Sequence, residues 1–113
     1  MKFGLQESVI ARVQGVLARY PQVQSAILYG SRAKGNCNTG SDIDLTLKGG
    51  EALNLSVLYR IMDDIDDLLL PYSFDLSIFH LITDLDVLDH IRRVGIVFYE
   101  KAAKETPDAA SGR

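Results

Sequence analysis

Two aspartates separated by one residue are the side chains of this sequence best suited to metal chemistry. Asp42 and Asp44 lie in the stretch 42–47, where polar residues alternate with Ile and Leu, as in a half-buried strand. Residues two apart on a strand point to the same face, with Cα atoms about 6.6 Å apart. Their carboxylates can converge on one divalent cation or bridge two ions roughly 3.5–4 Å apart, and hard oxygen ligands suit Mg²⁺ or Mn²⁺. Alone, the same pair could also be a solvated strand face.

A third carboxylate comes from a later segment of the same kind. Asp75 lies on the polar face of the alternating stretch 73–79, although Asp is depleted in strands. If the two strands pair, three carboxylates share one surface, where like charges repel each other unless a cation is bound. The three acids together favour a metal site over a solvated face.

A glycine and a serine precede the first two acids. Gly30 and Ser31 follow the short apolar run 26–29, which is typical of a buried strand. Glycine lets a backbone approach a ligand closely, and the amides at a helix start bind anions. A Gly-Ser pair at a strand end can equally be an ordinary turn. Its combination with the acids favours a phosphate cradle beside a metal site, to which Arg32 and Lys34 add positive charge.

The elements that must position these residues follow from hydrophobic periodicity. It predicts helices over 5–20, 52–70 and 84–93, and strands over 26–29, 42–47, 73–79 and 96–99. Residues 30–41 are expected to form a helical turn followed by a loop. The order predicts an α/β fold, an α+β sandwich with a mixed four-stranded sheet and helices packed largely on one face. Residues 1–100 are expected to form one domain and residues 101–113 a flexible tail.

Composition excludes several other classes. Twelve Lys and Arg against fifteen Asp and Glu in 113 residues give a net charge of −3, which argues against an extended nucleic-acid surface. No uncharged apolar run approaches the ~20 residues of a membrane span. The one cysteine, Cys37, allows neither an intrachain disulfide nor a Cys-based zinc site. A cytoplasmic protein is the simplest expectation.

The pattern of Gly30-Ser31, ten residues, Asp42-x-Asp44 and a later Asp75 resembles the signature of the polymerase-beta-like nucleotidyltransferase superfamily. The length and the element order resemble its smallest branch, the minimal nucleotidyltransferases (MNT), over about residues 5–100. The resemblance implies transfer of a nucleoside monophosphate to a hydroxyl, which attacks the α-phosphate of a nucleoside triphosphate and displaces pyrophosphate.

The resemblance also implies residue roles. The catalytic acids, which would also bind two Mg²⁺ ions (Mn²⁺ possible), are Asp42, Asp44 and Asp75, the last of which would also help orient the attacking hydroxyl. The residues implied in nucleotide binding are Gly30, Ser31, Arg32 and Ser41. ATP is the habitual substrate of such proteins, although no residue here selects adenine by its spacing.

Members of this branch often work beside a small helical HEPN protein. The resemblance implies an antitoxin that transfers AMP from ATP to a tyrosine of a HEPN toxin. Two alternatives stay open: a non-catalytic partner that neutralises a HEPN protein, and nucleotidyl transfer to a small-molecule acceptor. Because the domain lacks the usual companion domains, a homo- or hetero-oligomer is expected. The acidic run over 63–67 is either a solvated helix face or a docking face for a basic partner.

Overall fold

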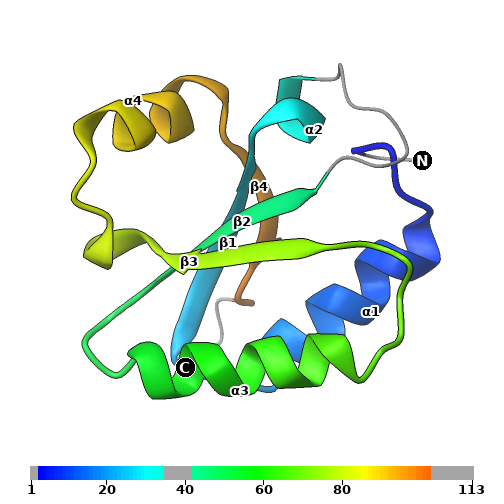
Figure 1. Ribbon diagram of the computed structural model, residues 1–113. Helices are drawn as coiled ribbons and strands as arrows, with labels where there is room; N and C mark the ends of the chain where they lie inside the picture. Colours follow the sequence, from blue (N-terminus) through cyan, green and yellow to red (C-terminus); the bar gives the residue numbers. More distant parts are fainter. Residues whose placement is uncertain (1–2, 35–41, 103–113) are drawn as a thin grey trace, which may run out of the picture.

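A mixed four-stranded sheet with the order β3-β2-β1-β4 forms the centre of the molecule (Figure 1). The computed structural model describes residues 3–34 and 42–102. Its strands are β1 (Val23–Tyr29), β2 (Ile43–Gly49), β3 (Phe74–Ile78) and β4 (Ile96–Glu100). β1 pairs antiparallel with β2 and β4, whereas β2 and β3 are parallel. The predicted mixed sheet is confirmed, and the tail predicted over 101–113 lies almost entirely outside the described residues.

Four helices and one 3₁₀ turn accompany these strands, the first helix preceding β1 and the others lying between strands. They are α1 (Glu7–Ala18), α2 (Ser31–Lys34), α3 (Leu55–Asp66), η1 (Phe79–Leu81) and α4 (Leu85–Val94). The two longest, α1 and α3, pack against each other on one side of the sheet, and α4 lies on the other side (Figure 1). No helix in the described ranges is long and apolar enough to cross a membrane.

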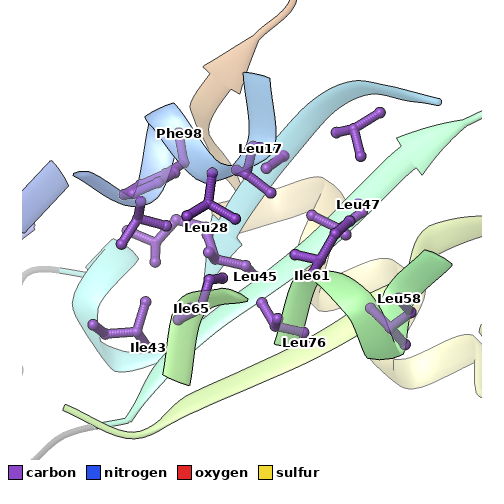
Figure 2. Close-up of a cluster of buried hydrophobic side chains, with 14 of the residues drawn as sticks. Leu17, Leu28, Ile43, Leu45, Leu47, Leu58, Ile61, Ile65, Leu76 and Phe98 are labelled. Carbon is purple, nitrogen blue, oxygen red and sulfur yellow. The ribbon is translucent and has the colours of Figure 1, made fainter. Parts of the chain in front are cut away.

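The hydrophobic core fills the space between the sheet and the helices α1 and α3. On β2, Ile43, Leu45 and Leu47 are completely buried and point into this core together with Ile61 of α3 (Figure 2). Leu28 of β1 is completely buried beside them. Burying such side chains is the main favourable term in folding. The strict alternation along β2 sends Asp44, Thr46 and Lys48 to the opposite face of the sheet.

The helices α1 and α3 are shorter than their apolar periodicity predicts. Local polar contacts and backbone conformation set the ends of α3. α3 begins at residue 55, not 52, because the Oδ1 of Asn54 accepts a hydrogen bond of 3.1 Å from the N–H of Val57, a typical N-cap. Beyond its last residue, Leu69 has a positive φ of 56°, a conformation that an α-helix cannot contain. The 3₁₀ turn η1, directly after β3, is not predicted by the sequence pattern.

Strand register aligns the polar face of the sheet in rows. Tyr29 pairs with Asp44 across β1 and β2, and Asp44 pairs with Asp75 across β2 and β3. The next row holds Ile27, Thr46 and Ser77 in the same manner. Because a slip of one residue would move the apolar set of β2 out of the core, the core fixes this register and with it the row of acids.

Candidate active site

Two of the three predicted acids meet on the open face of the sheet. Asp44 and Asp75 are register partners on the parallel strands β2 and β3, which puts their Cα atoms about 4.8 Å apart with both side chains on one face. Asp75 is exposed and Asp44 half-buried. Asp42 lies one residue before β2 and is exposed. The strand pairing on which the predicted metal site depends is therefore present.

Gly30 brings the two halves of the motif into contact. Its φ is +82°, a value that glycine adopts readily and other residues rarely do. A Cβ at this position would overlap the Oδ2 of Asp44 and lie 3.3 Å from its Cγ. Residue 30 must therefore be glycine for two independent reasons, backbone conformation and space. The turn after β1 and the first carboxylate on β2 form one site.

Ser31 begins the short helix α2, directly beside this contact. It is half-buried, and the helical turn is closed by a 3.2 Å hydrogen bond from the N–H of Lys34 to the carbonyl of Gly30. The structure therefore keeps the Gly30-Ser31 pair beside the row of carboxylates formed by Asp44 and Asp75. Ser41, the other serine of the predicted nucleotide site, lies outside the described residues, as does Cys37.

Arg32 has structural contacts in place of an exposed guanidinium. Its side chain is only 3% exposed, its Nη1 donates a 2.9 Å hydrogen bond to the carbonyl of Phe3, and its guanidinium lies 5.5 Å from the ring centre of Tyr72. These contacts tie α2 to the N-terminal segment. A role of Arg32 in nucleotide binding stays a prediction.

The site holds like charges at close range. Burial raises the pKa of the Asp44 carboxyl, and the neighbouring Asp75 and Asp42 carboxylates raise it further, while His90 lowers it. Ionised carboxylates that repel each other in a partly dehydrated place are stabilised by a bound cation. The oxygen donors fit Mg²⁺ or Mn²⁺ in their chemistry.

A complete metal cage is not assembled in the structure. Within residues 3–34 and 42–102, no group of three or more His, Cys, Asp or Glu side chains gathers closely enough to hold a metal ion. The structure brings Asp44 and Asp75 together and leaves Asp42 at the rim. Magnesium commonly keeps water and substrate phosphates as further ligands, so two protein carboxylates are enough to begin a magnesium site. The metal-binding roles of the three acids stay predictions.

Two aromatic residues lie beside the acids, Tyr29 in the same row of the sheet and His90 on α4, and the motif does not point to either. Burial raises the pKa of Tyr29, which is half-buried and opposite Asp44, and the Asp75 and Asp44 carboxylates add to this effect. The ring of His90 on α4 meets the Tyr29 ring edge-on, with centres 6.3 Å apart. Because side chains alternate along a strand, Tyr29 of the stretch 26–29 lies on the same face as the acids. No local sequence pattern predicts that α4 packs over Tyr29.

Comparison with known proteins identifies the family. The model of the polymerase beta nucleotidyltransferases matches residues 11–104. The chain belongs to this family. The matched range spans the Gly30-Ser31 turn, both acids of the Asp-x-Asp pair and Asp75. Family membership and fold thus confirm the resemblance drawn from the sequence.

Solved structures of minimal nucleotidyltransferase systems share this family fold. A toxin–antitoxin structure with AMP-PNP aligns with a TM-score of 0.65 at 18% identity, covering 87% of this chain and 76% of the other. An MNT antitoxin complex with tri-AMPylated HEPN toxin from Shewanella oneidensis gives 0.63 at 15%, covering 86% and 74%. A protein assigned as a minimal nucleotidyltransferase gives 0.63 at 22%, covering 85% and 95%. No curated protein matches the sequence.

Proposed function

We propose that this nucleotidyltransferase transfers AMP from ATP to a tyrosine hydroxyl of a HEPN-family partner and thereby acts as an antitoxin. The single observation that supports nucleotidyl transfer is the contact between Gly30 and the Asp44 carboxylate, because it brings the turn that we propose binds phosphate against an acid that we propose binds metal. The HEPN partner and the tyrosine acceptor are supported by structural likeness to MNT antitoxins.

The residues of the chain divide the work of such a transfer. Asp42, Asp44 and Asp75 would hold Mg²⁺, which when bound neutralises triphosphate charge and lowers the pKa of the attacking hydroxyl. Gly30 and Ser31 would hold the phosphates, since residue 30 has no side chain to keep them at a distance. Asp75 is exposed on the edge strand β3, where an incoming hydroxyl can reach it.

The reaction balances as a simple displacement. The hydroxyl oxygen forms a bond to the α-phosphorus, the bond from that phosphorus to the pyrophosphate oxygen breaks, and the hydroxyl proton goes to Asp75 or to water. Holding the two reactants in line supplies much of the rate enhancement by converting a bimolecular step into one within a complex. The chain therefore acts mainly by positioning and by charge.

The test is transfer of label from ATP labelled at the α-phosphate to a co-purified partner protein. Asp44→Asn and Asp75→Asn should each reduce labelling about 100-fold or more, as loss of one group that stabilises a transition state commonly does. Asp86→Asn, an exposed acid in the first turn of α4, is the matched control and should label normally. An excess of unlabelled GTP should compete poorly if adenine is selected.

Labelling that persists in both site variants would rule out this use of the carboxylates. Neutralisation of the toxin by Asp44→Asn without any labelling would instead favour the non-catalytic partner. Label found on a small molecule and on no protein would favour a small-molecule acceptor.

A further inference from the structure

A cavity of about 660 Å³ lies between the segment η1–α4 and the open face of the sheet. We call it the α4 pocket. The lining residues that matter here are Ile27, Lys48, Phe79, Leu88, Ile91 and Arg92. Sites for small ligands and for anchoring side chains are typically about 300–1,000 Å³ and mostly apolar, so the α4 pocket has the size and the lining of a binding site.

The charge of the α4 pocket is opposite to that of the acid row. Lys48, His80 and Arg92 line it, and among its lining residues in the described chain there is no carboxylate. The Lys48 ammonium lies 4.6 Å from the ring centre of Phe79. Asp89 accepts hydrogen bonds from both Arg92 and Arg93, so this one carboxylate does not cancel the positive charge beside the pocket, and Lys48 adds to that charge. An acidic ligand is attracted here and repelled by Asp44 and Asp75.

The α4 pocket lies next to the candidate active site. Ile27 precedes Tyr29 by two residues on the same face of β1, about 6.6 Å along the strand, and Tyr29 is the register partner of Asp44. α4 contributes Ile91 to the pocket and the His90 ring beside Tyr29. A segment anchored in the pocket is held within one row of the sheet from the carboxylates.

Exposed apolar side chains extend this surface beyond the pocket. Leu81 is 51% exposed and Leu85 78% exposed, and both belong to the segment 79–92 that forms one wall. Single exposed apolar residues are ordinary, whereas several around a pocket mark an interaction site. Neither lines the pocket itself, but two exposed apolar side chains on the segment that forms its wall favour a protein segment over a small ligand as the occupant.

We propose that the α4 pocket docks an acidic segment of the acceptor protein through one large apolar side chain, with Lys48 pairing a carboxylate. Naming the occupant as the acceptor rests on the proposed function, but binding itself needs no transfer. The pocket thereby selects the acceptor, while the carboxylate row performs the transfer.

The experiment measures fluorescence anisotropy of a labelled, glutamate-rich peptide with a central Leu-Phe pair, bound to the full chain carrying Asp44→Asn. Saturable binding is expected. Lys48→Glu should weaken it about tenfold, because reversing a charge next to a charged ligand changes attraction to repulsion, and Leu88→Trp should weaken it by filling the pocket. Arg60→Glu, a charge reversal at an exposed residue of α3, is the matched control. Circular dichroism verifies that each variant is folded.

Three binding results would overturn the proposal, besides the ATP result below: no saturable binding, equal binding of the peptide with lysine in place of glutamate, or binding that Lys48→Glu and Leu88→Trp leave unchanged. Displacement of the peptide by ATP, with the same dependence on Lys48, would assign the pocket to nucleotide and also overturn it. Peptide binding together with absent transfer by the unmutated chain would overturn the proposed function alone.

Discussion

A methyl group at residue 30 has no room beside the Asp44 carboxylate. Gly30→Ala should therefore lower the free energy of unfolding by about 1–2 kcal/mol, the cost of a left-handed conformation for an ordinary residue, and should displace Asp44 and abolish transfer. Urea unfolding and the labelling assay measure both effects. Gly15→Ala is the control, because a Cβ there meets nothing within 4 Å. That change lies inside α1 and should stabilise by about 0.5–1 kcal/mol. Full activity in Gly30→Ala would contradict the site.

The Asp44 carboxylate should itself lower the stability of the metal-free protein. Its pKa is raised by burial and by the neighbouring acids, so the folded state disfavours the ionised form. Asp44→Asn should raise the melting temperature at pH 7 in EDTA, while Glu51→Gln, at an exposed turn, should leave it unchanged. A lower melting temperature for Asp44→Asn would show that the carboxylate makes stabilising contacts instead.

At the scale of single residues, spacing predicted the parts of the site that lie within or next to strands. Asp44 and Asp75 meet because alternation fixes the face of each strand. The burial of Arg32 could not be predicted, because an arginine after a Gly-Ser turn can bind a phosphate or a distant carbonyl equally well. His90 could not be placed either, since its approach to Tyr29 depends on how α4 packs.

Among elements, the turn that follows α3 contains a strained residue. Leu69 has φ +56° and is 88% exposed, so its side chain adds strain without burial. Leu69→Gly should raise the free energy of unfolding by about 0.5–1 kcal/mol, the relief of left-handed strain less the larger entropy of glycine in the unfolded chain. Urea unfolding measures it. Leu55→Gly, at a half-exposed residue in the first turn of α3, should destabilise by contrast.

The helix α4 should lose stability in acid. The pKa of Asp89 is lowered mainly by its hydrogen bond from Arg93. The positive charges of Arg93 and Arg92 lower it further. A carboxyl group whose pKa is lower in the folded state than its unfolded pKa of about 3.9 stabilises the folded state when the pH is above that unfolded pKa. This stabilisation is lost as the pH falls through the lower pKa of the folded state. Carboxyl NMR titration should show that the pKa of Asp89 is lower than the pKa of an unperturbed Asp. Asp89→Asn should remove the corresponding part of the pH dependence of unfolding. An ordinary titration would contradict the pairing.

The order and type of all the main elements were predictable, because each carries either a period in its apolar residues or, as in 26–29 and 96–99, a short apolar run beside a glycine. The residues at which these elements begin and end were less predictable. α3 begins later than its apolar stripe because Asn54 caps it, and β1 begins earlier because Val23 is buried although it lies outside the apolar run. Periodicity reports which face is covered, whereas capping and turn geometry decide where an element stops.

At the scale of the whole molecule, the core and the site depend on the same strand. Leu45 is completely buried between Asp44 and Thr46. Leu45→Ala should reduce the free energy of unfolding by about 2–5 kcal/mol, and its urea transition should keep the slope of the parent protein. Leu55→Ala, on the half-exposed start of α3, should cost far less. Equal effects would mean that the core does not lie where the structure places it.

The arrangement of the sheet could be predicted only in part. Alternating helices and strands imply a mixed sheet, but no residue pattern states that β1 lies between β2 and β4. That order results from packing the apolar faces of all four strands against α1 and α3 together. The parallel pairing of β2 with β3, which juxtaposes Asp44 and Asp75, follows from the helical crossover between them.

The row Tyr29–Asp44–Asp75 joins three stretches that are far apart along the chain. A nascent chain that ends before residue 75 therefore lacks one carboxylate of this row. Since β4 pairs with β1, the sheet also keeps an open central edge until the last strand emerges. The row of side chains is therefore a property of the folded sheet, which no single segment of the chain can supply alone.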